Sequence, residues 1–188
     1  VRVVIPVFPG TNSEYDTQKA FEEAGAKVSQ VIFTNTREDD IERSIKEFVK
    51  EIKKSHIIAL PGGFSAGDEP DGSAKFIVNI LKNDEVKEAI HDHLADKKLI
   101  LGICNGFQAL IKSGLLPYGK ICDLDEDDLT LFRNTGLRHI SDTVITRVSS
   151  TKSPWTQNFD LGNIHEVVIS HGEGRLVGNN IEEFKHLA

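Results

Sequence analysis

Several features that mark other protein classes are scarce in this 188-residue chain. It has two cysteines and no CxxC pair, so a disulfide framework is excluded and a reducing compartment fits. No apolar run approaches the roughly 18 residues of a membrane span. No signal peptide precedes the first apolar segment, and methionine is absent, even at position 1. We therefore expect a cytoplasmic domain that is a fragment of a longer chain.

Basic residues are also few. The 22 lysines and arginines are outnumbered by 29 acidic residues, which leaves a net charge of -7. Nucleic-acid binding needs a basic stripe to contact phosphates, and the sequence contains none. With 39% hydrophobic and 27% charged residues, residues 1–188 are expected to form a single domain with a sizeable core.

Motifs for nucleotides and metals are missing as well. The glycine-rich segment 61–68 lacks the GK[ST] ending of a phosphate-binding loop, and the glycines within 172–178 miss dinucleotide spacing by one residue. His91 and His93 are expected on a helix, where residues two apart do not share a face. The acidic segment 123–128 lacks the glycine and glutamate of a calcium loop. We expect neither a metal nor a nucleotide site in this domain.

What the chain does contain is a regular alternation of short apolar runs with helical patterns. This alternation is typical of a doubly wound, mostly parallel sheet flanked by helices. Strands are expected over 1–8, 28–33, 56–60 and 99–103, with further strands at 142–148 and 167–170; helices are expected over 13–24, 38–53 and 73–94 and after residue 104.

Glycine-bearing loops follow three of these strands, at 9–12, 61–68 and 102–106. In parallel sheets of this kind, ligands bind beyond the carboxyl ends of the strands. The three loops are therefore expected to converge on one crevice.

Cys104 stands where the strand pattern at 99–103 changes to a helical one. Gly102 and Gly106 lie two residues away on either side, as in a tight strand–turn–helix elbow. The positive end of a helix favours thiolate over thiol, so Cys104 is a candidate nucleophile. The same pattern also fits a small cysteine buried in the core, and we expect Cys122 to be a small, partly buried residue.

His171 and Glu173 follow the apolar run 167–170 in the sequence SHGEGR. Residues two apart on extended backbone project from the same face, so these two side chains are expected to lie together. A carboxylate near a histidine orients the ring and stabilises its protonated form, which suits a base that serves a cysteine. Alone, the pattern fits an ordinary strand end equally well.

Together, PGGFSAGD, GICNGFQ and SHGEGR resemble the class I, triad-type glutamine amidotransferases. In detail they resemble the glutaminase part of phosphoribosylformylglycinamidine synthases. FPGTN near the start, DEPDGSAKF at 68–76 and the stretch 118–155 extend the similarity, and they are more similar to the large fused synthases than to separate glutaminase subunits. The resemblance implies a flavodoxin-like fold that is truncated at its C-terminus, because family members continue into further strands.

The resemblance also implies roles for individual residues. Cys104 would attack the glutamine side-chain amide to form a thioester, with His171 as base and Glu173 as third member of the triad. The backbone N–H groups of Gly63 and Asn105 would form the oxyanion hole, and Gln108 would contact the bound glutamine.

The partner implied by the resemblance is a synthetase module, which uses the released ammonia to convert formylglycinamide ribonucleotide to formylglycinamidine ribonucleotide. ATP and magnesium would bind to that module, and no cofactor is expected in this domain. Two other readings remain: a cysteine hydrolase or stress-response protein with a similar elbow, and a non-catalytic domain that docks on a synthetase.

Overall fold

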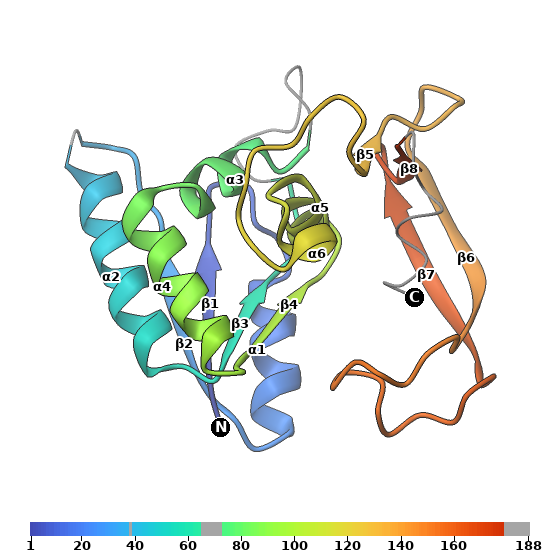
Figure 1. Ribbon diagram of the computed structural model, residues 1–188, viewed down its shortest axis with the longest axis horizontal. Helices are drawn as coiled ribbons and strands as arrows, with labels where there is room; N and C mark the ends of the chain where they lie inside the picture. The colour runs from blue at the N-terminus through green and yellow to red at the C-terminus, as the bar shows by residue number, and fades with distance from the viewer. Residues whose placement is uncertain (38, 65–72, 179–188) are drawn as a thin grey trace. The chain divides into compact units, whose positions relative to one another are not determined.

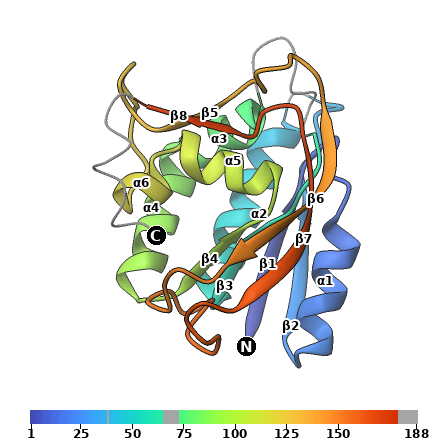
Figure 2. The ribbon, with the colours of Figure 1, turned by 90° about the vertical axis from the view of Figure 1, so that its right-hand side faces the viewer.

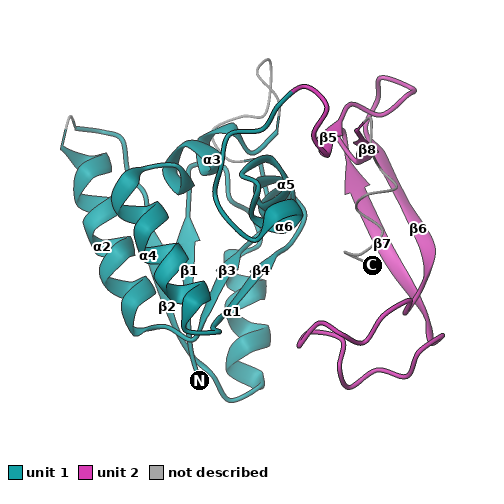
Figure 3. Ribbon diagram, in the orientation of Figure 1, with its two compact units in different colours: residues 1–125 teal, residues 126–188 magenta. Residues whose placement is uncertain are grey.

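The computed structural model describes residues 1–37, 39–64 and 73–178. The chain divides into two compact units, the first from Val1 to Asp125 and the second from Glu126 onward (Figure 3). The first unit contains the alternation of strands and helices expected from the sequence. The second unit consists of antiparallel strand pairs and loops.

A four-stranded sheet forms the centre of the first unit, with strand order β2-β1-β3-β4 (Figure 1). The strands are β1 (Arg2–Val7), β2 (Lys27–Ile32), β3 (Ile57–Leu60) and β4 (Leu99–Gly102). All three pairings are parallel, and Leu60 at the end of β3 is in register with Gly102 at the end of β4. The predicted parallel sheet is therefore confirmed, and the loops after β3 and β4 leave it side by side.

Helices connect these strands, and two more helices come after β4 in the chain. They are α1 (Glu14–Glu23), α2 (Asp40–Lys54), α3 (Lys75–Leu81), α4 (Asp84–Ala95), α5 (Asn105–Lys112) and the short α6 (Leu115–Tyr118). The single helix expected over 73–94 is two helices. Asn83 separates them, because its side chain accepts hydrogen bonds from the N–H groups of Glu85 and Val86 and so begins a new helix.

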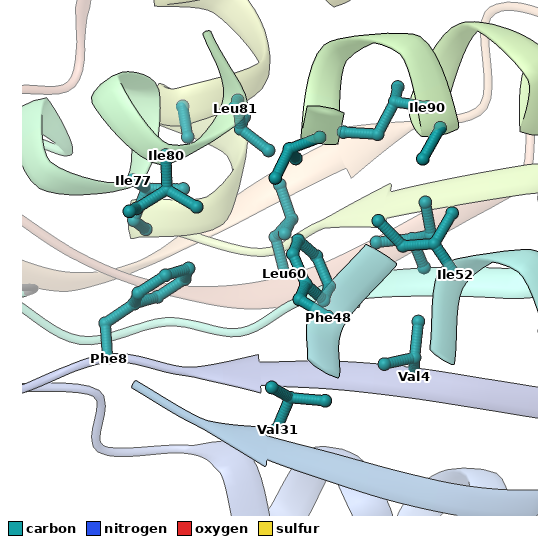
Figure 4. Packing of buried hydrophobic residues seen from close by; sticks show 14 of the residues in the cluster. Val4, Phe8, Val31, Phe48, Ile52, Leu60, Ile77, Ile80, Leu81 and Ile90 are labelled. Carbon is teal, nitrogen blue, oxygen red and sulfur yellow. The ribbon is translucent and has the colours of Figure 1, made fainter. Parts of the chain in front are cut away.

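Apolar side chains cover both faces of this sheet. The larger cluster combines strand residues such as Val4 and Leu60 with residues of α2 to α5, among them the fully buried Phe48 (Figure 4). A smaller cluster on the other face contains Val3, Ile5 and Ala59, and Phe21 of α1 packs against it. Helices on both faces explain why these strands read as nearly continuous apolar runs.

The second unit is built from two antiparallel pairs, which Figure 2 shows as neighbouring strands. The long pair joins β6 (Ile140–Arg147) to β7 (Ile164–His171), and the short pair joins β5 (Thr130–Phe132) to β8 (Arg175–Val177). The sequence predicted β6 and β7 but neither β5 nor β8, because runs of three residues carry too little periodicity. In the described ranges, no helix is long and apolar enough to cross a membrane.

His93 is the most deeply buried histidine among the described residues, with 2% of its surface exposed. Its Nε2 lies 3.1 Å from the carbonyl oxygen of Leu99, which links α4 to the start of β4. Burial lowers the pKa of the His93 imidazole, because desolvation penalises the charged ring; the Leu99 carbonyl opposes this shift. The ring is thus a neutral packing element.

We expect the stability of the chain to fall as pH drops below about 6.5, the ordinary pKa of histidine. The unfolded chain then binds a proton that the folded chain resists, so the slope of unfolding free energy with pH is positive, up to about 1.4 kcal/mol per pH unit. Urea unfolding between pH 5 and 7 should show a smaller slope for His93→Gln, whereas His165→Gln, at an exposed position, should leave it unchanged. Equal slopes in all three proteins would contradict this prediction.

Candidate active site

Cys104 occupies the turn between β4 and α5, with its side chain exposed. Its backbone angles are φ 51° and ψ −107°, a conformation that side-chain-bearing residues rarely adopt. Such backbone strain costs about 1–3 kcal/mol and persists only where the surrounding structure imposes it. The predicted elbow is confirmed, and the alternative of a cysteine buried in the core is wrong.

The surrounding structure that imposes this turn is the contact between α5 and β3. A Cβ on Gly106 would lie 2.1 Å from the carbonyl oxygen of Leu60, so only glycine allows the helix to approach so closely. The Gly106 N–H donates to the Pro61 carbonyl at 3.2 Å, and the Ile103 N–H donates to the Leu60 carbonyl at 3.0 Å. The residues on either side of Cys104 are therefore bonded to the end of β3.

The loops after β1 and β3 meet at the same place. Thr11 and Gly63 form an isolated antiparallel bridge, flanked by bonds from Asn12 N–H to the Gly62 carbonyl and from Phe64 N–H to the Gly10 carbonyl. A Cβ placed on Gly62 would lie 3.2 Å from the Cβ of Cys104. The predicted convergence of three loops is confirmed. Residues 65–72, which contain parts of PGGFSAGD and DEPDGSAKF, lie outside the described residues.

Gly63, the first predicted oxyanion donor, has a φ of 140°. A Cβ there would lie 2.6 Å from the Gly10 carbonyl oxygen, so both conformation and space require glycine. The bonds beside the bridge use the neighbours of Gly63, and its own N–H has no acceptor among residues 1–37, 39–64 and 73–178. Its role as an oxyanion donor stays a prediction.

Asn105, the second predicted donor, is the first residue of α5, and Gln108 lies one turn further along. Both side chains are buried, and the Asn105 Nδ2 donates to the Gln108 Oε1 at 3.0 Å. The Gln108 N–H also donates to the Cys104 carbonyl at 3.0 Å. Gln108 therefore supports the first turn of α5 directly under the cysteine; its contact with glutamine stays a prediction.

Ser13 belongs to this site and was missed by the sequence reasoning, which treated it as the start of a helix. It precedes α1, but its hydroxyl makes no capping bond to that helix. Instead Ser13 Oγ accepts from the Gly62 N–H at 2.9 Å and lies 3.3 Å from the Gly62 carbonyl oxygen. It thereby ties the start of α1 to the turn beside Cys104.

His171 is the last residue of β7 and is half-buried. Its Nδ1 lies 3.0 Å from Oδ1 of Asn134, a buried side chain that reaches it from the loop after β5. No sequence pattern pointed to Asn134, because the two residues are 37 positions apart. The ring of the predicted base is therefore held by an amide.

Glu173 lies two residues after His171, and its side chain is half-buried. The expected extended backbone is wrong here, because β7 ends at His171 and residues 172–173 form a bend. The imidazole instead lies over Gly174, where a Cβ would be 2.2 Å from the His171 Nδ1. The strand alternation from which the sequence placed these two side chains together therefore does not apply, and the pairing of Glu173 with His171 stays a prediction.

The predicted residues fall into two sets. Cys104, Gly63, Asn105 and Gln108 lie in the first unit, and the pair 171/173 lies in the second. Cys122 is half-buried, as expected of a packing residue. Within residues 1–37, 39–64 and 73–178, no group of three or more His, Cys, Asp or Glu side chains is placed to hold a metal ion.

The comparison with protein families agrees with the elbow and its neighbouring turns. A model of the CobB/CobQ-like glutamine amidotransferase domain matches residues 1–188, the whole chain. The chain belongs to this family. The amidotransferase resemblance carried by the three motifs is confirmed.

Curated relatives of the chain are named phosphoribosylformylglycinamidine synthase subunit PurQ. The protein from Roseobacter denitrificans is 32% identical over 93% of this chain, and that from Campylobacter jejuni is 34% identical over 93%. The chain spans about 65% of the length of the first and 64% of the second. These relatives are separate subunits, and the predicted origin from a fused synthase stays a prediction.

Solved structures share the fold. The structure of PurLQS from Thermotoga maritima matches 94% of this chain and 69% of its own chain, with a TM-score of 0.68 and 29% identity. A glutamine amidotransferase from the same organism matches 96% of this chain and 64% of its own, with a TM-score of 0.51 and 17% identity. The predicted fold class, a parallel sheet flanked by helices as in class I amidotransferases, is confirmed.

We expect Cys104→Gly to be more stable than Cys104→Ala by about 1 kcal/mol. Glycine relieves a backbone strain of about 1–3 kcal/mol. The greater conformational freedom of glycine in the unfolded chain offsets roughly 0.5–1 kcal/mol of this gain in stability. Urea unfolding of both variants measures the difference. Ala109→Gly, inside α5, should instead lose about 1 kcal/mol. A Cys104→Gly protein no more stable than Cys104→Ala would show that the turn is unstrained.

Gly174→Ala should displace the His171 imidazole, because the new methyl group would overlap the ring. Gly172→Ala is the matched control, since the nearest atom to its Cβ is 4.0 Å away. We expect the ring resonances of His171, followed by NMR on histidine-labelled chain, to shift in the first variant and stay in place in the second. Similar small shifts in both variants would contradict the close packing of ring on backbone.

Proposed function

We propose that the chain is the glutaminase of a phosphoribosylformylglycinamidine synthase. It hydrolyses glutamine to glutamate and ammonia, and both compact units act together as one amidotransferase domain. The family match over the whole chain and the names of its relatives support this proposal. The single observation that carries it is the strained backbone of Cys104 between the end of β4 and α5.

The reaction uses Cys104 as nucleophile and His171 as base. The imidazole takes the thiol proton, and the sulfur forms a bond with the side-chain amide carbon of glutamine. When the C–N bond breaks, the imidazolium gives its proton to the leaving nitrogen, which departs as ammonia. A water molecule then attacks the thioester with the same base, and glutamate leaves as the thiol re-forms.

Negative charge develops on the amide oxygen in both steps. The N–H groups of Gly63 and Asn105 are the proposed donors to this oxygen, and the bridge between Thr11 and Gly63 in the turn beside Cys104 supports this assignment. One such donor contributes about 100- to 1,000-fold in rate. Gln108 is the proposed contact for the bound glutamine, and Glu173 the carboxylate that stabilises the protonated imidazole of His171.

Ammonia that escapes into water at neutral pH becomes ammonium and is no longer a nucleophile. We therefore propose that a synthetase module receives it directly and forms formylglycinamidine ribonucleotide from formylglycinamide ribonucleotide. ATP and magnesium would bind to that module, and the complex would be cytoplasmic. The Thermotoga maritima structure, whose name combines PurL, PurQ and PurS, is consistent with such an assembly.

Labelling with diazo-oxo-norleucine, an electrophile that mimics glutamine, tests the site. We expect one adduct per chain by mass spectrometry, located on Cys104 and suppressed by glutamine. Cys122→Ala should be labelled like the wild type, and Cys104→Ala should not be labelled. The same two variants should respectively keep and lose the release of ammonia from glutamine.

In a second arm of this experiment, the labelling is repeated after a synthetase has been added. If the chain is labelled only after a synthetase of this pathway is added, the proposed glutaminase function stands, and the activity depends on the partner. Folded chain that stays unlabelled and releases no ammonia with the synthetase present would favour a docking domain. Hydrolysis of peptide or aldehyde substrates, with none of glutamine, would favour the cysteine hydrolases.

A further inference from the structure

The carboxamide of Asn134 uses every hydrogen-bonding position that it has. Its Nδ2 donates to the carbonyl oxygens of Arg138 at 3.0 Å and His171 at 2.8 Å. Its Oδ1 accepts from the Gly174 N–H at 3.2 Å and lies 3.0 Å from Nδ1 of His171. Only 4% of its surface is exposed, so water does not compete for these partners.

These partners allow one orientation of the amide. Flipping it would place Nδ2 against the Gly174 N–H, a donor, and Oδ1 against two carbonyl oxygens, which are acceptors. The oxygen therefore faces the imidazole of His171, and an oxygen can only accept. The Nδ1 of His171 must carry the proton of this bond, which leaves the lone pair of a neutral ring on Nε2.

The backbone holds Asn134 in place independently of its side chain. Its N–H donates to the Gly172 carbonyl at 3.0 Å, and its carbonyl accepts from the Leu137 N–H at 2.9 Å. The preceding Phe132 pairs with Arg175 across β5 and β8, so both ends of the bend at 172–174 are bonded to the segment that carries Asn134. The amide and the imidazole belong to one small rigid cluster.

We propose that Asn134 is the positioning residue of the catalytic base: it fixes His171 as the tautomer with Nδ1 protonated, so that Nε2 takes the proton of the Cys104 thiol. This proposal rests on the proposed glutaminase function. Asn134 does not touch the substrate and acts only through the ring. Because its oxygen is uncharged, it sets the tautomer and the direction of the ring without adding a negative charge.

Histidine-selective ¹⁵N labelling of the chain tests the tautomer directly. Two-dimensional NMR of the seven histidines should show neutral His171 with a protonated Nδ1 in the wild type. In Asn134→Ala, the ring of His171 has lost the acceptor that holds this proton on Nδ1. The proton should therefore move to Nε2 in a substantial fraction of molecules. Asn158→Ala, which removes an exposed amide from the loop between β6 and β7, is the matched control and should keep the wild-type spectrum.

Kinetics provides the second readout. The kcat for glutamine hydrolysis should fall about 100-fold in Asn134→Ala, the lower range of what a general base contributes, while KM changes little. In Asn134→Asp, a carboxylate faces the ring and stabilises its charged form. The acidic limb of the pH–rate profile should then move upward by about 1 pH unit. A purely structural role for Asn134 would lower stability without this shift.

Two results would overturn the proposal: a wild-type His171 with its proton on Nε2, or an Asn134→Ala protein with unchanged tautomer and kcat. Should Asn134→Ala fail to fold, the wild-type spectrum decides, because it tests the tautomer without any substitution. A wild-type protein that never releases ammonia, even with its synthetase, would contradict the proposed function instead. The ring spectra would still decide whether Asn134 sets the tautomer.

Discussion

The close approach of α5 to the end of β3 is the constraint on which the first unit depends. With Gly106 against the Leu60 carbonyl, the chain must reverse from strand to helix within two residues, and this reversal forces Cys104 into its strained backbone conformation with a positive φ. The turn after β3 then lies directly against the cysteine. Strain, exposure of the thiol and closeness of the Gly63 turn are thus three consequences of one packing contact.

A different principle shapes the second unit. There, among the described residues 126–178, no cluster of buried apolar side chains forms around the histidine. Instead the polar side chain of Asn134 joins a strand end, a bend and a loop by four hydrogen bonds. Buried polar networks of this kind are stable only when every member is satisfied. The proposed nucleophile is therefore placed by packing, whereas the proposed base is placed by hydrogen bonding.

This difference explains which predictions succeeded. The parallel sheet, its helices and the elbow were predicted because apolar periodicity and the glycines at 102 and 106 are local signals. The break at Asn83 was missed, although its capping pattern is visible in the sequence, because the apolar residues continue through it. The short strands β5 and β8 were missed because runs of three residues carry too little periodicity.

By itself, the sequence determined the fold class, the position of the candidate nucleophile in an elbow and the motifs that mark the family, since each depends on residues close together in the chain. Only the tertiary structure decided which side chains hold the turn beside Cys104 and the ring of His171 in place. Ser13 meets Gly62 across 49 residues, and Asn134 meets His171 across 37. Such contacts leave no periodic trace, because a single polar residue in a loop looks the same in the sequence whether its partner is water or an imidazole.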